Sequence, residues 1–154
     1  MQAALVTGQK QVELVEFAHP EPTEHHTVVG ISYCGICGTD LHAYLSGDPY
    51  NPAICGHEWV GHVSASHSHE FKEGDRVAIG VASPCGVCSA CTRGDPAHCE
   101  RVFASATGRD AHAAAHGGFA PYIGIATERL YHVPAELTDE EAGLLEPATV
   151  AIHA

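Results

Sequence analysis

Basic residues are scarce in this sequence. Its 154 residues include only 7 lysines and arginines against 19 aspartates and glutamates, which gives a formal net charge of -12. Nucleic acids and anionic membranes are bound through clustered positive charge, and so acidic a chain has little to build such a surface from. We therefore expect small-molecule or protein partners, and neither nucleic acid nor a membrane.

Long apolar runs are also missing. No stretch approaches the roughly 18 consecutive apolar residues of a membrane-spanning helix, and the start, residues 1–6, lacks the basic residues and apolar run of a secretory signal. There is no internal repeat and no low-complexity tract. These absences predict a soluble, cytoplasmic protein, and the length allows one ordinary core.

A third absence concerns nucleotide binding. No Gly-x-Gly-x-x-Gly pattern follows a predicted strand anywhere in the chain. Such a glycine-rich turn lets the backbone approach the phosphates of a dinucleotide at the start of a helix. The sequence therefore offers no site for a dinucleotide cofactor.

Histidine and cysteine, in contrast, are plentiful. The chain has 13 histidines and 7 cysteines, and both side chains are metal ligands. In a reducing compartment an odd number of cysteines is better explained by thiolate ligands and spare thiols than by a disulfide framework, although a disulfide framework stays open as an alternative. We expect at least one metal site.

Strand patterns dominate the chain, and short helices fill part of the rest. Alternating or β-branched apolar stretches bounded by turn residues predict strands at residues 3–6, 12–17, 27–33, 59–65, 76–81, 119–125 and 130–133. A helix is predicted after Gly38, with Thr39 or Asp40 as its cap and Gly47 as its stop.

The end of the chain predicts a second helical region. Thr138 opens a capping-box sequence, and the helical pattern continues and resumes after Pro147. It reaches Ala154 without a stop signal, which we interpret as the mark of a piece of a longer protein.

Four cysteines lie in a segment that has no strand or helix periodicity, residues 83–101. Cys85, Cys88, Cys91 and Cys99 follow one another at intervals of three, three and eight residues. Four thiolates satisfy the tetrahedral preference of zinc and close the site to substrate, so we predict a structural zinc that folds the loop. The same spacing is compatible with an iron-sulfur cluster or with scattered thiols.

A second group of ligand-type residues flanks two predicted strands. Cys34 and Cys37 follow one strand, and His57 and Glu58 precede another, with glycines on either side. A thiolate, an imidazole and a carboxylate on rigid elements would form a metal site. Taken alone, the two cysteines are also typical of a redox pair, and the His-Glu pair of an ordinary surface.

Together these motifs resemble those of the zinc-dependent medium-chain alcohol and polyol dehydrogenases, over essentially the whole chain. The motifs are CGICGTDLH from residue 34, GHEWVG from residue 56, CGVCSACTRG from residue 85 and LEPATVAIHA from residue 145. The resemblance implies a mainly β fold with short helices, a GroES-like partly open β-barrel with a zinc-binding loop and a C-terminal helix. Residues 1–137 would form the catalytic domain, and 138–154 the start of a helix toward a nucleotide-binding domain.

The resemblance also implies ligand sets for two zinc ions per chain. Cys37 and His57 would hold a catalytic zinc, with Glu58 as a ligand or an exchanging neighbour and Glu146 as the last protein ligand. Which glutamate binds directly stays open, and Cys34 is not a ligand in that pattern. In having glutamate at position 146 the chain resembles polyol dehydrogenases of the sorbitol dehydrogenase kind, whereas liver-type alcohol dehydrogenases have cysteine there. This difference implies a polyol or another secondary alcohol as substrate. The structural zinc would take the four cysteines of residues 83–101.

The chemistry that the resemblance implies is oxidation of an alcohol or polyol by NAD or NADP, through a zinc alkoxide and hydride transfer. Thr39 and His42 would relay the proton, Glu58 would lie beside the metal, and Asp40 would orient a ligand. The whole enzyme is expected to be a homo-oligomer, and this chain alone, without a nucleotide domain, to be inactive. The alternative is a free-standing GroES-like zinc module with a binding or assembly role.

Overall fold

The computed structural model describes residues 1–153 as short strands and short helices. The strands are β1 (Gln2–Gly8), β2 (Gln11–Glu16), β3 (His26–Cys34), β4 (Trp59–Ala65), β5 (Arg76–Ile79), β6 (Tyr122–Ala126) and β7 (Leu130–His132). The α-helices are α1 (Gly38–Ser46), α2 (Ser89–Thr92), α3 (Glu100–Ala106), α4 (Asp139–Ala142) and α5 (Leu145–His153). Single 3-10 turns are η1 (Pro52–Ile54), η2 (Pro96–His98) and η3 (Thr127–Arg129).

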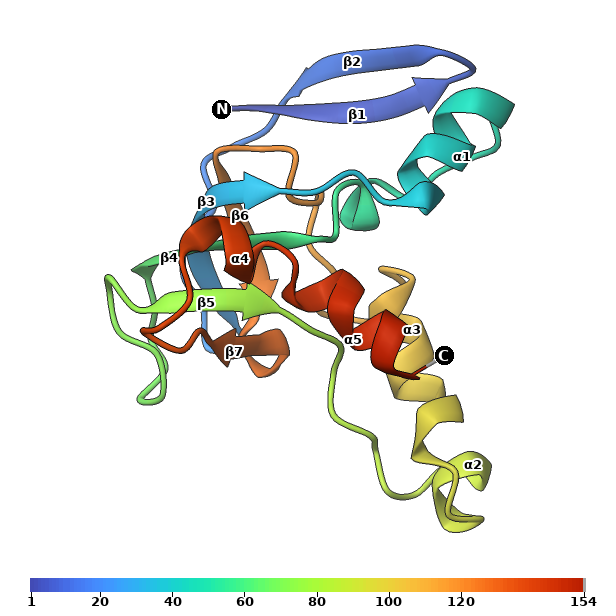
Figure 1. Ribbon diagram of the computed structural model, residues 1–154, viewed down its shortest axis with the longest axis vertical. Helices are drawn as coiled ribbons and strands as arrows, with labels where there is room; N and C mark the ends of the chain where they lie inside the picture. The colour runs from blue at the N-terminus through green and yellow to red at the C-terminus, as the bar shows by residue number, and fades with distance from the viewer. Residues whose placement is uncertain (154) are drawn as a thin grey trace.

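The main sheet is antiparallel and curled. Its order is β6-β3-β4-β5-β7, while β1 and β2 form a separate hairpin (Figure 1). β6 and β7 lie at opposite edges, yet only η3 joins them. That connection spans at most roughly 14 Å, whereas the edges of a flat five-stranded sheet lie about 19 Å apart. The sheet must therefore curl into a partly open barrel, which confirms the predicted mainly β fold with short helices.

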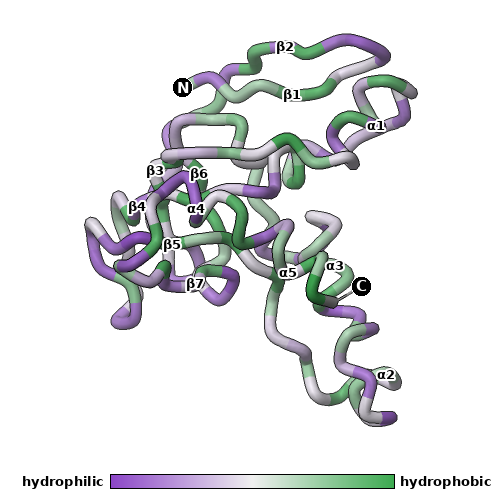
Figure 2. Tube along the Cα trace, in the orientation of Figure 1, coloured by the Kyte–Doolittle hydropathy of each residue, from purple (hydrophilic) through white to green (hydrophobic). Residues whose placement is uncertain are grey.

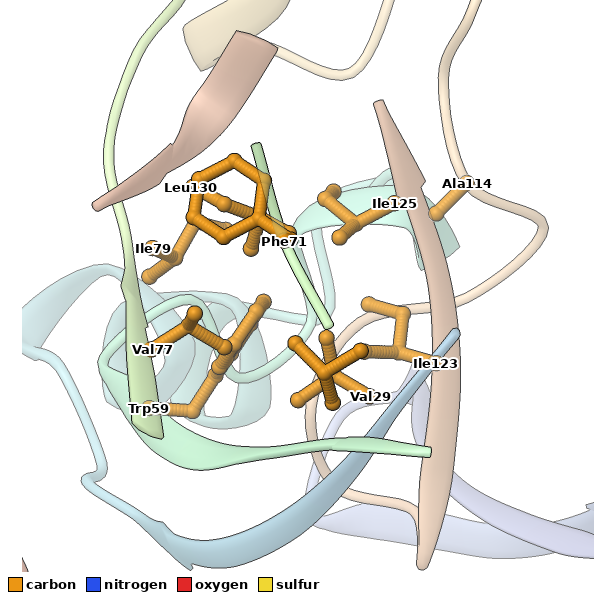
Figure 3. Packing of buried hydrophobic residues seen from close by; sticks show 10 residues of the cluster. Val29, Trp59, Phe71, Val77, Ile79, Ala114, Ile123, Ile125 and Leu130 are labelled. Carbon is orange, nitrogen blue, oxygen red and sulfur yellow. The ribbon is translucent and has the colours of Figure 1, made fainter. Parts of the chain in front are cut away.

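The curled sheet encloses an apolar core. Val29 on β3, Trp59 and Val63 on β4, and Ile123 on β6 are almost completely buried. Figure 3 shows most of the core side chains directed toward a common interior. Residues two apart in a strand share a face, so the alternating apolar positions of several strands meet there. Each large apolar side chain buried in this way contributes about 1.5–3 kcal/mol.

Helices α4 and α5 cover the outer face of the sheet. A second apolar cluster includes Val60 and Ala78 from β4 and β5 and Ala142 from α4, with the partly buried Leu145 of α5 packed against it. Two polar contacts anchor α4. Arg76 forms an ion pair with Asp139 at 2.8 Å. Tyr33 on β3 donates a hydrogen bond to the Glu140 carboxylate. These contacts fix the segment that carries α5 against β4 and β5.

Hydrophilic residues concentrate in the turn between β4 and β5 and along α4 (Figure 2). Across residues 1–153, no helix has both the length and the apolar character that crossing a membrane would require.

Helix α1 ends at the predicted stop, but it begins earlier than a cap at Thr39 or Asp40 would allow. Cys37 is the N-cap residue, rather than Thr39 or Asp40. Asp40 acts from the third helical position, where its carboxylate accepts the Cys37 N–H. Gly47 ends the helix in the left-handed conformation, with φ of 77°, which glycine adopts without the steric cost of a side chain.

Two further details differ from the sequence patterns. The helical region after Thr138 is two helices, and Pro147 lies in the first turn of α5, where an N–H would have no intrahelical partner in any case. Residues 83–101 contain α2 and η2, and α3, which no pattern predicted, begins within them. The predicted lack of a stop at Ala154 falls on the residue outside the described part of the chain.

Gly61 offers a test of the register between β3 and β4. A Cβ atom at this position would lie 2.2 Å from the carbonyl oxygen of Gly30. We expect Gly61→Ala to lower the free energy of unfolding by about 1–3 kcal/mol, because the backbone of β3 must move. Urea unfolding followed by Trp59 fluorescence measures this change.

Gly38→Ala is the matched control for this substitution. Gly38 is exposed, and an added Cβ atom would meet nothing within 4 Å. Its free energy of unfolding should change by no more than about 0.5 kcal/mol. Equal unfolding midpoints for the two variants would contradict the steric account.

Candidate metal centres

The pairing of β3 with β4 brings two distant segments of the sequence together. β3 ends at Cys34, which pairs with the first residue of β4. Gly35 extends the ladder by one bond, since its N–H donates to the carbonyl oxygen of Glu58 at 2.6 Å. Cys37 follows β3 closely, and His57 precedes β4 closely. Antiparallel pairing therefore places both ligand-bearing segments at the same end of the ladder.

Three ligand-type atoms converge there. The Sγ of Cys37, a ring nitrogen of His57 and a carboxylate oxygen of Glu58 all lie within 4.8 Å of one another. His57 Nδ1 lies 2.9 Å from the carbonyl oxygen of Ile54, and because a carbonyl only accepts, Nδ1 must carry the proton. Nε2 then keeps a free lone pair for a metal, in the way that such contacts usually fix a ligating histidine.

The donor set fits zinc. Zinc binds thiolate, imidazole and carboxylate at about 2.0–2.3 Å, so the three atoms need little movement to share one ion. All three side chains are half-buried, which reduces competition from water while leaving an approach for a substrate. Three protein donors also leave zinc a free position, which is characteristic of catalytic sites.

Two glycines make room for this cluster. A Cβ atom on Gly35 would lie 2.6 Å from the Oε2 of Glu58. Gly56 has φ of 75°, and a Cβ atom there would lie 2.7 Å from the ring of Phe119. Only glycine therefore fits at these two positions beside the ligands, as their place in the motifs suggested.

Asp40 connects the two ligand-bearing segments. Its side chain is 2% exposed, and it accepts the Cys37 N–H at Oδ2 (2.9 Å) and the Gly56 N–H at Oδ1 (3.0 Å). The Tyr50 hydroxyl donates to the same Oδ1 at 2.6 Å. Burial and this hydrogen bond raise the pKa of Tyr50, so the hydroxyl keeps its proton at neutral pH. No sequence pattern pointed to Tyr50, because its contact depends on the fold.

The two residues of the predicted proton relay lie on α1. Thr39 Oγ1 is 3.6 Å from the Sγ of Cys37, at the edge of the cluster. His42 lies one turn further along, where its imidazole is 75% exposed and its Nε2 is 3.5 Å from Asp48. This arrangement has one hydroxyl beside the cluster and one imidazole in solvent, and the relay itself stays a prediction.

Glu146 lies in the first turn of α5, which packs on the outer face of the sheet. Burial raises the pKa of its carboxyl, while His57 lowers it and the Glu58 carboxylate raises it. Its side chain is thus close enough for both charges to act on it, although it is not one of the three that converge within 4.8 Å. The assignment of Glu146 as a zinc ligand stays a prediction.

The four cysteines of the loop form a second cluster. The sulfur atoms of Cys85, Cys88, Cys91 and Cys99 all lie within 4.8 Å of one another. Backbone N–H groups point at them: the N–H of Cys85 donates to Cys99, and that of Cys88 to Cys85, both at 3.3 Å. Such bonds, led by the one from Cys85, lower the pKa of Cys99 to about 6. Backbone N–H groups also lower the pKa of Cys88, whereas burial raises the pKa of Cys91 to about 12. The backbone therefore favours thiolate, the form that binds metal, at Cys88 and Cys99.

The segment that holds these cysteines has almost no core of its own. Between residues 83 and 101 only Ala90 and Cys99 are buried, and the segment extends away from the sheet (Figure 1). Because this segment buries so little apolar surface, its folded conformation needs another source of stability. A metal ion bound by the four sulfur atoms would provide one.

The remaining thiols differ in kind. All seven cysteines lie in the described part of the chain, and none forms a disulfide. Burial, with smaller effects from Asp40 and neighbouring groups, raises the pKa of Cys34 to about 12, so this thiol stays protonated. Cys55 is 1% exposed and packs as a small buried side chain.

The family comparison covers most of the chain. Residues 23–135 match the model described as the alcohol dehydrogenase GroES-like domain. The match includes both clusters, and Glu146 lies beyond it.

Several individual relatives are named as dehydrogenases. The chain is 34% identical over 161 residues to sorbitol dehydrogenase of Bacillus subtilis (strain 168), and 36% identical over 160 residues to L-idonate 5-dehydrogenase (NAD(P)(+)) of Escherichia coli (strain K12). The crystal structure of galactitol-1-phosphate dehydrogenase from Escherichia coli is similar with a TM-score of 0.77 at 26% identity. These alignments cover 99–100% of this chain but only 44–46% of the relatives. The chain thus spans less than half of their length.

The loop cluster predicts a loss of metal when one sulfur is removed. Cys91→Ser should cost one of the two expected zinc ions per chain, and amides of residues 83–101 should exchange faster, because that loop has no other support. Cys34→Ser is the matched control, since Cys34 is also half-buried and lies outside the four-cysteine cluster. Elemental analysis and hydrogen exchange measure both effects, and a full zinc complement in Cys91→Ser would contradict the assignment.

Proposed function

The chain belongs to the alcohol dehydrogenase GroES-like domain family, and from that premise we propose that it is the zinc-carrying catalytic portion of an NAD(P)-dependent alcohol or polyol dehydrogenase. In this proposal the chain binds and activates the hydroxyl substrate, and a part of the protein beyond these residues binds the nucleotide. The names of the relatives, sorbitol dehydrogenase and L-idonate 5-dehydrogenase (NAD(P)(+)), support both the reaction type and the cofactor class.

One observation carries the proposal. Cys37, His57 and Glu58 converge within 4.8 Å at the end of the β3–β4 ladder, and the Ile54 carbonyl holds the imidazole with its second nitrogen available. Three donors with an open position suit a site that must accept a substrate oxygen, whereas the four-cysteine cluster offers none. We assign the first cluster to catalysis and the second to folding.

Zinc bound by these residues would supply a positive charge that makes the hydroxyl of a bound alcohol more acidic. The chain's own groups do the rest. Thr39, at the edge of the cluster, takes the proton from the alcohol. His42 passes it to solvent, since its exposed imidazole can accept a proton at one ring nitrogen and release one from the other. Neutral His57, the Cys37 thiolate and one carboxylate balance the charge of the ion.

A second carboxylate would oppose that positive charge. We therefore propose that Glu58 and Glu146 compete for one position, so that only one of them binds at a time. The effects of His57 and Glu58 on the pKa of Glu146 support their proximity. Glutamate at position 146 favours polyols or other secondary alcohols over simple primary alcohols, in agreement with the names of the relatives.

A chimera tests the proposed activity. Residues 1–154 would replace the aligned portion of the Bacillus subtilis sorbitol dehydrogenase, which supplies the remaining chain. We expect zinc-dependent reduction of NAD or NADP with a polyol, measured by absorbance, and none from the isolated chain, because its sequence contains no Gly-x-Gly-x-x-Gly pattern. Cys37→Ser in the chimera should abolish the activity. His67→Ala should leave it intact, because His67 is an exposed residue between β4 and β5 and belongs to neither cluster.

Two outcomes would contradict this proposal. One is oxidation by the isolated chain, because it would mean that no further domain is needed. The other is a chimera that is folded and zinc-loaded by elemental analysis, yet inactive on every polyol and secondary alcohol tested.

The proton path gives a separate prediction. Thr39→Val keeps the shape of the side chain and removes its hydroxyl, so kcat in the chimera should fall by about 10²–10⁴-fold. Thr39→Ser retains a hydroxyl and should retain most of the activity. Steady-state kinetics with matched zinc content measure both, and an unchanged kcat in Thr39→Val would exclude Thr39 from the relay.

A further inference from the structure

The Tyr50 hydroxyl lies between the two groups that orient the proposed metal ligands. It donates to Asp40 Oδ1 at 2.6 Å, and it lies 3.4 Å from the carbonyl oxygen of Ile54. Asp40 is the carboxylate that holds the backbone of Cys37 and Gly56, and Ile54 provides the carbonyl that fixes the His57 ring. One hydroxyl thus adjoins the supports of both ligand segments.

The shorter contact identifies where the hydroxyl proton goes. A single O–H donates well to one acceptor, and a bond of 2.6 Å to a carboxylate is in the range of strong, charge-assisted hydrogen bonds. Tyr50 therefore donates to Asp40. This bond restrains rotation of the carboxylate, whose Oδ2 must face the Cys37 N–H while Oδ1 faces the Gly56 N–H.

We propose that Tyr50 is a positioning residue that acts through Asp40 to set the spacing between Cys37 and His57. The inference rests on the proposed function, because it requires these two residues to share a metal. Without the hydroxyl, the Asp40 carboxylate is free to turn, and either the Cys37 or the Gly56 backbone loses its bond. The two segments then separate, since Asp40 is the side chain that hydrogen-bonds to both.

Neighbouring elements hold Tyr50 in place for this role. The next residue, Asn51, donates from its side-chain amide to the carbonyl oxygens of Thr107 and Gly108, both at 2.8 Å. It also caps η1, by accepting the N–H of Ala53 at 3.0 Å. The backbone that follows the tyrosine is therefore anchored, and removal of its hydroxyl should leave the ring where it is.

The test uses metal binding rather than turnover. The chain is loaded with cadmium-113, and NMR resolves the four-cysteine cluster and the Cys37–His57 cluster as separate resonances because their ligands differ. Tyr50→Phe should shift or broaden only the resonance of the Cys37–His57 cluster. Its zinc affinity, measured by competition with a chelator, should fall about tenfold, the lower end of the effect that support of metal ligands usually has.

Tyr33→Phe is the matched control. It also removes a tyrosine–carboxylate hydrogen bond, the 2.8 Å contact with Glu140, but the Arg76–Asp139 ion pair and the apolar contacts of Ala142 still hold α4 against the sheet, so both ligand segments and α5 should keep their places. It should change neither cadmium resonance nor the zinc affinity of the Cys37–His57 cluster. The four-cysteine resonance serves in each variant as an internal measure of folding.

A double-mutant cycle establishes the route of the effect. If Tyr50 acts through Asp40, Asp40→Asn combined with Tyr50→Phe should bind zinc as Asp40→Asn does alone. Additive losses, an unchanged affinity in Tyr50→Phe, or equal disturbance of both cadmium resonances would each overturn the inference. Absence of any metal at Cys37 and His57 in the unmodified chain would instead overturn the proposed function, and this inference with it.

Discussion

The register of β3 against β4 decides whether the proposed catalytic cluster exists. Cys37 follows the end of one strand and His57 and Glu58 precede the start of the other, so they meet only when Cys34 pairs with the first residue of β4. Polarity alone does not enforce this register, because Trp59 and Val60 are both buried, on opposite faces. The sizes of the side chains enforce it instead. Trp59 fills the interior, and only glycine fits at position 61, where a Cβ atom would lie 2.2 Å from the carbonyl oxygen of Gly30 on β3.

The two clusters depend on different parts of the molecule. The four cysteines lie within one short segment, and their convergence needs only local turns and the N–H groups that point at the sulfur atoms. The Cys37–His57 cluster is non-local, and it needs the sheet, two glycines and the buried Asp40 carboxylate. In the proposed assignment, the four-cysteine cluster stabilises a region that lacks a core, whereas the Cys37–His57 cluster depends on a core formed elsewhere.

Helices α4 and α5 connect the outside of the sheet to the same cluster. The Arg76–Asp139 ion pair and the apolar contacts of Val60 and Ala142 hold this segment against β4 and β5. As a result Glu146 lies within electrostatic reach of His57 and Glu58. Glu146 and Glu58 thus approach the same region from different elements, α5 and the start of β4, as the proposed competition between them requires.

The sequence by itself determined the strands, the cap at Thr138, the glycine stop of α1 and the ligand types, since these follow from local periodicity, turn chemistry and residue spacing. Residue types and their places beside two predicted strands suggested that the Cys34–Cys37 and His57–Glu58 pairs could share a metal, and the family resemblance selected Cys37 over Cys34. Only the tertiary structure decided that Cys37 caps α1, that the last helical region divides in two, and that Asp40 and Tyr50 span both ligand segments. These features depend on contacts between residues far apart in the chain or on competition among several possible caps, and spacing along the sequence does not encode either.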